Sequence, residues 1–319
     1  MNLQGMTSWG LGALALGTLL LAATPAAAKV NVFACESDWA ALATEIGGDL
    51  VSSTSATTAF QDPHQIQARP SLIARLRNAD LLICNGGELE IGWLPVLLLQ
   101  SANGRIQPGT PGYVMVADLL TLHDIPAQAD RALGDVHPRG NPHVQTDPRH
   151  IARAAQVLAE RLGILDPDHA ERYLARYRDF SQRWEEAMQR WEAKAAPLRG
   201  VPVVAHHKAW TYLFSWLGMP EAGYLEPKPG VPPSSAHLNA LLAHLKVNPA
   251  RMVIRSPYDA PQASEFVADR LGIPMVLLPF SVGGTPEAKN LFDLFDDTID
   301  RLLQGAQGKT IAAGLPERP

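Results

Sequence analysis

The sequence predicts an α/β protein in which two parallel-sheet lobes are joined by one long helix. Segments with strand and helix periodicity alternate from Val30, a charged segment with evenly spaced aromatics begins at Asp166, and the alternation returns after Gly200. Alternating units of this kind form parallel sheets covered by helices. We therefore divide the chain into a signal peptide, an N-terminal lobe, a linking helix and a C-terminal lobe, at residues 1–28, 29–165, 166–198 and 199–319.

The first 28 residues predict a secretory signal peptide. They contain no Asp, Glu, Lys or Arg, they are almost wholly apolar from Leu11 to Leu21, and they end in Ala26-Ala27-Ala28. A small-residue cleavage site after a short apolar run is typical of such peptides, although the usual positive charge before the run is missing. The run is too short for a comfortable membrane span. We expect a mature protein that begins near Lys29 and is located in the periplasm.

The N-terminal lobe is predicted to contain a strand, a helix, a strand, a helix and a strand, at residues 30–35, 38–46, 50–53, 71–76 and 79–84. The helices have apolar residues at helical spacing, and the strands are short apolar runs. Ligands of such folds collect in loops beyond the carboxyl ends of the strands, and His64 lies in one of these loops. Cys35 and Cys84 either form a disulfide or remain two buried thiols, and both possibilities stay open.

Between Asp118 and Asn141 the periodicity disappears. The segment contains prolines, glycines and several side chains that can bind metal, namely His123, Asp124, Asp130, Asp135 and His137. We interpret this segment as a mobile loop.

The linking helix is predicted from large side chains spaced three or four residues apart in a charged background: Tyr173, Tyr177, Phe180, Trp184, Met188 and Trp191. This pattern describes an amphipathic helix of roughly eight turns that starts beside Pro167 and is stopped by Pro197. We interpret the aromatic stripe as core packing and not as a cofactor site. The second lobe then repeats the architecture of the first, with strands at 201–205, 252–255 and 275–278 and helices at 209–217, 263–271 and 289–303.

Three histidines are the main candidates for chemistry. His64 follows Asp62-Pro63, His143 follows Asn141-Pro142, and His207 follows a strand-like run after one residue. Imidazole is the usual nitrogen ligand of a borderline metal, and three imidazoles that converge from distant loops make a zinc-like site. Four others we treat as ordinary histidines without a ligand: His150, His169, His237 and His244.

With these motifs, the chain resembles the periplasmic metal-binding proteins of ABC importers for zinc and manganese, especially their zinc-uptake branch. The resemblance covers nearly all of the mature chain. It rests on Asp62-Pro63-His64 with Arg69-Pro70-Ser71, Asn78-Ala79-Asp80-Leu81 with Asn85-Gly86 and Leu89-Glu90, Asn141-Pro142-His143 with Asp147-Pro148, and His207-Lys208-Ala209-Trp210 with Tyr212. It implies the helical-backbone fold of that family, in which a long rigid helix bridges the lobes and the matching histidines, His64, His143 and His207, hold the metal between them.

The resemblance also implies a function, which is to capture Zn2+ in the periplasm and deliver it to a membrane permease of an ABC transporter. Zn2+ is favoured over Mn2+ because imidazoles suit zinc, whereas manganese prefers oxygen donors. The family motif favours His207 over His206, because its ligand stands two residues before a small residue that an aromatic follows. The loop with His123 and His137 resembles the flexible loop of zinc-uptake members, so it is either a solvated surface loop or a low-affinity metal collector.

One family feature is missing from this chain. The fourth ligand is usually a carboxylate after a late strand of the second lobe, where this chain has Leu277-Leu278-Pro279-Phe280. Zinc takes about four donors. The fourth donor remains open between water and a carboxylate such as Asp62, Glu88 or Asp259.

Two other functions compete with metal transport. A periplasmic zinc hydrolase is the alternative, because three histidines and a bound water also form a catalytic site. The chain has no His-Glu-x-x-His, Gly-x-Ser-x-Gly or Ser-x-x-Lys motif near the histidines, so we expect it not to be an enzyme. A metal-independent adhesin with the same fold is the third possibility. The formal net charge of −5 gives no reason to expect nucleic acid or an anionic membrane as partner, and we expect a monomer.

Overall fold

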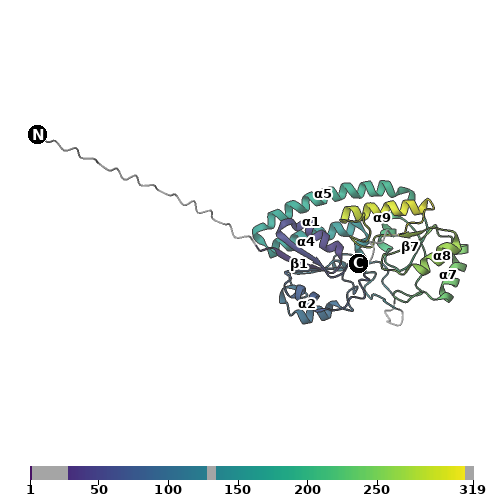
Figure 1. The fold of residues 1–319 in the computed structure, drawn as a ribbon, viewed down its shortest axis with the longest axis horizontal. Helices are drawn as coiled ribbons and strands as arrows, with labels where there is room; N and C mark the ends of the chain where they lie inside the picture. The colour runs from purple at the N-terminus through teal and green to yellow at the C-terminus, as the bar shows by residue number, and fades with distance from the viewer. Residues whose placement is uncertain (2–27, 128–133, 313–319) are drawn as a thin grey trace.

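In a computed structural model of the protein, the described residues are Met1, 28–127 and 134–312. The predicted signal peptide at 1–28 therefore lies almost wholly outside the described residues, as does Asp130 of the predicted mobile loop. The described residues form two α/β lobes that lie side by side under one long helix (Figure 1).

The N-terminal lobe is built on a four-stranded parallel sheet with the strand order β2-β1-β3-β4. Its central strands are apolar, and every residue of β3 is buried because helices cover both faces of such a sheet. The elements of this lobe are β1 (Val30–Ala34), α1 (Ser37–Gly47), β2 (Val51–Ser55), α2 (Pro70–Arg77), β3 (Leu81–Cys84), α3 (Leu94–Ser101) and β4 (Tyr113–Met115).

The C-terminal lobe has a second four-stranded parallel sheet, with the equivalent strand order β6-β5-β7-β8. Its elements are β5 (Val203–Ala205), α6 (Thr211–Leu217), β6 (Glu221–Tyr224), α7 (Ser235–Val247), β7 (Met252–Arg255), α8 (Pro261–Leu271), β8 (Met275–Leu277) and α9 (Leu291–Ala306). The repeated architecture predicted from the sequence is thus confirmed.

Two helices connect the lobes. The first, α4 (Pro148–Leu165), begins where the Asp147 side chain accepts a hydrogen bond from the Arg149 amide, and the second, α5 (Ala170–Ala195), follows it directly. The long helix is confirmed, but it is shorter than predicted because residues 167–169 and 196–198 form 3₁₀ turns at its two ends. It contacts α1, α4 and α9, which lie beneath it along its length in Figure 1.

The aromatic stripe of α5 is core packing, as predicted. Trp184 and Trp191 are fully buried, and their rings lie 4.9 Å from the ring of Phe292 and 5.2 Å from that of Phe295, respectively. Both phenylalanines belong to α9 of the C-terminal lobe. The helix is therefore attached to the C-terminal lobe by large apolar contacts.

Besides one smaller apolar cluster within each lobe, one large apolar core runs through both lobes. It includes Trp39 of α1, Trp184 of α5 and Ile254 of β7. Polar contacts cross the same boundary, because the Ser37 hydroxyl donates to the Val282 carbonyl (2.8 Å) and the Val282 amide donates to the Asp38 carboxylate (3.1 Å). The lobes are thus packed against each other as well as linked.

Five elements were not predicted: α3, β4, α4, β6 and α7. The strands among them are the edge strands of their sheets: β4 (Tyr-Val-Met) is apolar but only three residues long, and β6 (Glu-Ala-Gly-Tyr), of four residues, carries little apolar pattern. By contrast, α4 buries residues at clear helical intervals, such as Ile151, Leu158 and Leu162. None of the helices in the described ranges combines the length and apolar character needed to cross a membrane.

Candidate metal centre

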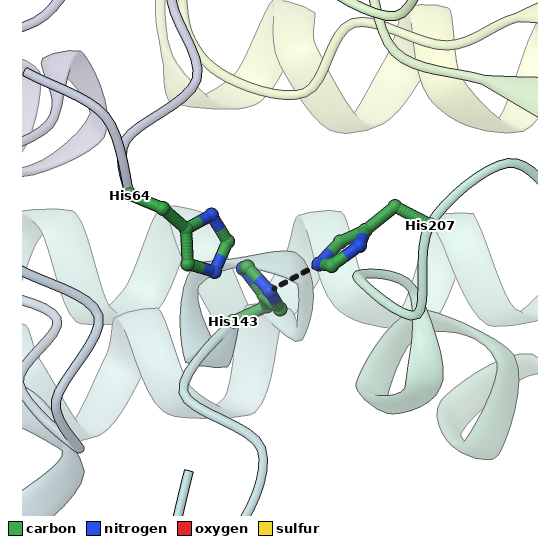
Figure 2. Close-up of side chains that lie close together, drawn as sticks. All are labelled: His64, His143 and His207. Atoms are coloured by element: carbon green, nitrogen blue, oxygen red, sulfur yellow. Dashed lines mark hydrogen bonds between the residues drawn. The ribbon is translucent and has the colours of Figure 1, made fainter. Parts of the chain in front are cut away.

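The three histidines predicted from the sequence lie together at the boundary between the lobes. His64 lies in the loop between β2 and α2, His207 lies two residues beyond β5, and His143 directly precedes the short 3₁₀ turn that leads into α4. Figure 2 shows the three rings pointing toward one another from three separate loops. Two of these loops follow the carboxyl ends of parallel strands, where ligands of α/β folds collect.

The spacing of the three rings fits one tetrahedral metal ion. The ring centroids of His64 and His143, His64 and His207, and His143 and His207 are 5.1, 5.4 and 5.3 Å apart. Imidazoles arranged tetrahedrally around zinc, with Zn–N bonds of about 2.0–2.1 Å, have centroids about 5.2 Å apart. The Nε2 atoms of His143 and His207 are 3.3 Å apart, and one ligand atom from each ring lies within 4.8 Å of the others.

Two carboxylates hold the outer nitrogens of these rings. Nδ1 of His64 lies 2.7 Å from Oδ1 of Asp62, and Nδ1 of His207 lies 2.6 Å from Oε2 of Glu226. A carboxylate that accepts a hydrogen bond from Nδ1 fixes the tautomer, which leaves the lone pair of Nε2 for a metal. Nε2 of His64 is buried and has no hydrogen-bond partner among the described residues.

His143 lies deepest in the site. It is 1% exposed, its Nδ1 is buried without a partner in the described structure, and the ring of Phe280 packs against it at 5.7 Å. Burial lowers the pKa of this imidazole well below its usual range, and the nearby rings of His64 and His207 lower it further. His143 is therefore neutral at neutral pH and able to donate a lone pair.

His207 behaves in the opposite way. Burial alone lowers the pKa of its imidazole, but the hydrogen bond and negative charge of Glu226 outweigh burial, and the pKa is raised above the ordinary value. The metal-free protein thus keeps a proton on His207 at a pH where a free imidazole has lost it.

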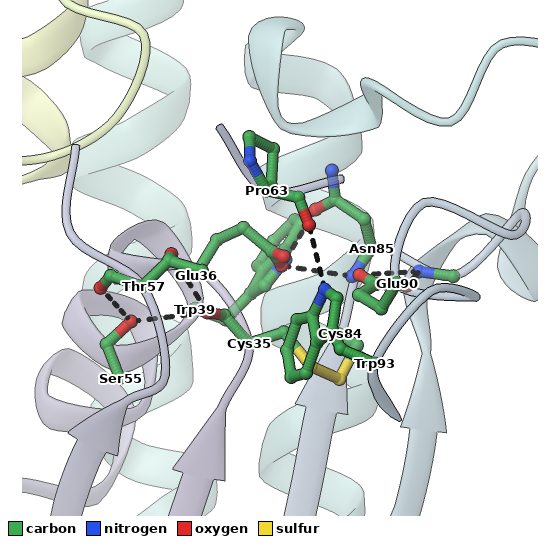
Figure 3. The surroundings of a disulfide bond; sticks show 11 residues. Cys35, Glu36, Trp39, Ser55, Thr57, Pro63, Cys84, Asn85, Glu90 and Trp93 are labelled. Carbon is green, nitrogen blue, oxygen red and sulfur yellow. Dashed lines mark hydrogen bonds between the residues drawn. A yellow bond between two sulfur atoms is a disulfide. The ribbon is translucent and has the colours of Figure 1, made fainter. Parts of the chain in front are cut away.

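Two buried side chains of the N-terminal lobe position the histidine loops. The Trp93 indole donates a hydrogen bond to the Pro63 carbonyl at 2.8 Å, next to His64. The Asn85 amide donates to the Pro142 carbonyl at 3.1 Å, next to His143, and its own oxygen accepts from the Trp39 indole at 2.6 Å. Figure 3 shows Trp39, Asn85 and Trp93 beside the ends of β1 and β3.

The same region contains a disulfide between Cys35 and Cys84, so the possibility of two free thiols is not realised. The bond joins the ends of neighbouring strands β1 and β3, with Cα atoms 4.8 Å apart. Beside it lie the buried carboxyl groups of Glu36 and Glu90 (Figure 3). Burial raises the pKa of Glu36 well above its usual range and that of Glu90 to about 7.

The carboxylates considered as a fourth donor lie in three different places. Asp62 contacts His64 through Nδ1, Glu88 is exposed and lines a separate cavity beside Ile91, and the Asp259 carboxylate accepts a hydrogen bond from the Ser256 amide at 2.7 Å. Burial raises the pKa of Asp259 above its ordinary value. Of the described carboxylates, Glu226 is the one that sequence reasoning missed, because it follows the unpredicted strand β6.

The other candidate histidines, His206, His123 and His137, differ in what their rings contact. The Nδ1 atom of His206 lies 3.4 Å from the Ser264 hydroxyl, and the exposed His123 packs its ring on Tyr212 at 4.9 Å. His137 stacks on His64 instead, with ring centroids 5.4 Å apart. It lines a cavity of about 160 Å³ together with His143 and His207.

Comparison with known proteins gives the family. The sequence profile of the family described as ZnuA, "Zinc-uptake complex component A periplasmic", matches residues 32–305. The chain belongs to this family. It is a family of solute-binding proteins of ABC transporters and not a family of enzymes.

Individual members of the ZnuA family and its relatives are distant in sequence but alike in fold. The chain is 24% identical over 221 residues to the high-affinity zinc uptake system protein ZnuA of Yersinia pestis, covering 65% of this chain and 69% of that protein. It is 22% identical over 293 residues to the manganese ABC transporter substrate-binding lipoprotein PsaA of Streptococcus pneumoniae, covering 88% and 91%. A crystal structure of ZnuA superposes with a TM-score of 0.70 at 23% identity, covering 88% of this chain and 99% of the other.

Proposed function

We propose that this protein captures Zn2+ in the periplasm, binds it between its two lobes through His64, His143 and His207, and delivers it to the membrane permease of an ABC importer. The observation that carries the proposal is the tetrahedral spacing of three imidazoles, two of which are oriented by a carboxylate. A relative named for zinc uptake and one named for manganese transport both match the chain. The nitrogen donors favour zinc, because manganese prefers oxygen ligands.

The proposal includes no catalysis. The two carboxylates nearest the rings, Asp62 and Glu226, are already hydrogen-bonded to them, so neither is free to act as a base on a metal-bound water. The zinc-loaded protein is therefore expected to leave a chromogenic ester and a peptide substrate intact. Hydrolysis that the apo protein lacks would favour the hydrolase alternative.

Metal analysis of protein purified from its native compartment tests the cargo, and competition titration then ranks zinc against manganese. We expect one zinc ion per chain. His64→Ala, His143→Ala and His207→Ala should each weaken zinc binding by roughly an order of magnitude or more, because removal of one of about four donors leaves the site incomplete. His244→Ala is a matched control, since His244 is exposed on α7. A variant among the three with full affinity would show that its histidine is not a ligand.

A further inference from the structure

The three histidines leave one tetrahedral position to another donor, and a fourth imidazole lies beside this position. The ring of His137 is 5.4 Å from that of His64 and 6.4 Å from that of His143, against about 5.2 Å for imidazoles bound tetrahedrally to one zinc ion. A shift of about 1 Å toward His143 would bring these two rings to that spacing as well. Its Nε2 is buried and has no hydrogen-bond partner among the described residues.

The backbone of this segment is held at the site from the other lobe. The amide of Asp135, two residues before His137, donates a hydrogen bond to the Pro229 carbonyl at 2.8 Å. The neighbouring amide of Gly230 donates at 2.9 Å to Glu226, the carboxylate that orients His207. The chain around His137 and the partner of His207 are thus held by adjacent residues of the C-terminal lobe, Pro229 and Gly230 respectively.

The other side chains considered as a fourth donor are engaged elsewhere. Asp62 and Glu226 accept from the outer nitrogens of His64 and His207, and Asp259 accepts from the Ser256 amide. Phe280, at the position where the family usually has its acid, presents an aromatic ring to His143. Among the described residues near the three histidines, His137 therefore combines proximity with a free, buried ligand atom.

We propose that His137 is the fourth metal ligand, so that this chain binds its cargo with four imidazoles. The proposal rests on the proposed function. An all-nitrogen site replaces the oxygen donor that manganese prefers, so His137 determines specificity as well as affinity for zinc. The missing carboxylate after β8 is then compensated by a residue from the loop before His143.

The test compares His137→Ala with His123→Ala, which removes the exposed histidine of the same loop. Loss of a residue that hydrogen-bonds to a metal-binding histidine typically weakens metal binding about 10- to 100-fold, and we expect His137→Ala to weaken zinc binding at least as much. The variant should also have a smaller preference for zinc over manganese. His123→Ala should retain the wild-type affinity. Chelator competition measures both metals, and thermal unfolding of each apo variant shows whether it is folded.

Spectroscopy counts the imidazoles bound to zinc, and this number would not change if His137 only stabilised the fold. X-ray absorption of the zinc-loaded protein should report four imidazoles in the wild type and in His123→Ala, and three imidazoles with one oxygen in His137→Ala. If the wild type and His137→Ala have the same zinc affinity and the same number of imidazole ligands, His137 is not the fourth ligand. The proposed function would remain intact. A wild-type protein that binds no zinc would overturn the proposed function itself.

Discussion

Glu226 orients the ring of His207, which we propose as a metal ligand. Its carboxylate lies 2.6 Å from Nδ1, and both groups are largely buried, with side chains 14% and 9% exposed. We predict that Glu226→Gln weakens zinc binding about 10- to 100-fold, because the amide no longer enforces the tautomer that frees Nε2. Chelator competition at pH 8 measures the change. The control is Glu221→Gln, which changes the exposed first residue of β6 and should have the affinity of the wild type. Equal losses in both variants would assign no orienting role to Glu226.

The pH dependence of zinc binding follows from the contact between Glu226 and His207. Because the pKa of His207 is raised, its ring is protonated in the apo protein below that pKa, and zinc must displace the proton. Affinity is therefore highest above the raised pKa and falls as the pH decreases through it. We predict much weaker zinc binding at about pH 5 than at about pH 7.5, with proton release on binding detectable by calorimetry in buffers of different ionisation enthalpy. An affinity that stays constant across this interval would mean that carboxylates are the main donors.

The sequence revealed the three convergent histidines but not their outer partners. His64, His143 and His207 each stand in a short polar motif in a loop, and His207 also follows an apolar strand, so their chemistry could be read directly. Glu226 lies 19 residues from His207 in the chain, in a segment without periodicity, and only the folded geometry brings the two together. Asp62 was considered as a metal ligand, whereas the structure places it behind the His64 ring.

At the scale of elements, the buried acids at the ends of β1 and β3 make stability depend on pH. Glu90 has a pKa raised from 4.5 to about 7, chiefly by burial, so its contribution to stability is present below pH 4.5 and is lost as the pH rises through about 7. Glu90→Gln carries no charge at any pH. We predict that the stability advantage of this variant over the wild type increases by on the order of 2–3 kcal/mol when the pH is raised from 5 to 8.

Urea unfolding of the metal-free protein at both pH values measures this effect. The control is Glu88→Gln, which changes an exposed acid two residues away and should behave alike at both pH values. A stability difference for Glu90→Gln that does not vary with pH would show that Glu90 is ionised in the folded protein throughout this range.

The disulfide between the same strand ends is expected to act on stability and not on metal binding. It spans 49 residues, and a crosslink of this span stabilises a fold by about 2–4 kcal/mol, mainly by restricting the unfolded chain. The double variant Cys35→Ala/Cys84→Ala should lose stability by that amount and keep tight zinc binding, because neither sulfur contacts the three histidines. Loss of zinc affinity in a variant that remains folded would show that the crosslink also positions the His143 loop.

The predicted elements were those with a strong internal pattern. Long amphipathic α5 and apolar β3 could be identified because their periodicity is maintained along their length. The edge strands β4 and β6 are formed by pairing with neighbours, and Gly223 in β6 carries no side chain that could reveal it. Helix α4, by contrast, has buried apolar residues at helical intervals, so its sequence alone is sufficient to predict it.

At the scale of the whole molecule, the shared core restricts how far the lobes move. Trp184 and Trp191 of α5 are buried against α9, while α1 and α4 pack against the same helix. We predict that zinc changes the radius of gyration by less than about 1 Å, as in pre-organised binding proteins. Small-angle scattering of apo and zinc-loaded protein measures this, with the zinc-induced rise in melting temperature as the control for loading. A compaction of several ångströms would indicate a hinge that divides the core.

If zinc binds as proposed, the core that both lobes share has a kinetic consequence for the bound ion. If the lobes do not part, the ion leaves only when a histidine-bearing loop detaches, so its residence time depends on the hydrogen bonds that Trp93 and Asn85 make to Pro63 and Pro142. These bonds are local, and each opening frees one ligand at a time. Dissociation is then a stepwise exchange of ligands and not a single opening event. A receiving protein that binds the loop of His64 would accelerate the first of these steps without separating the lobes.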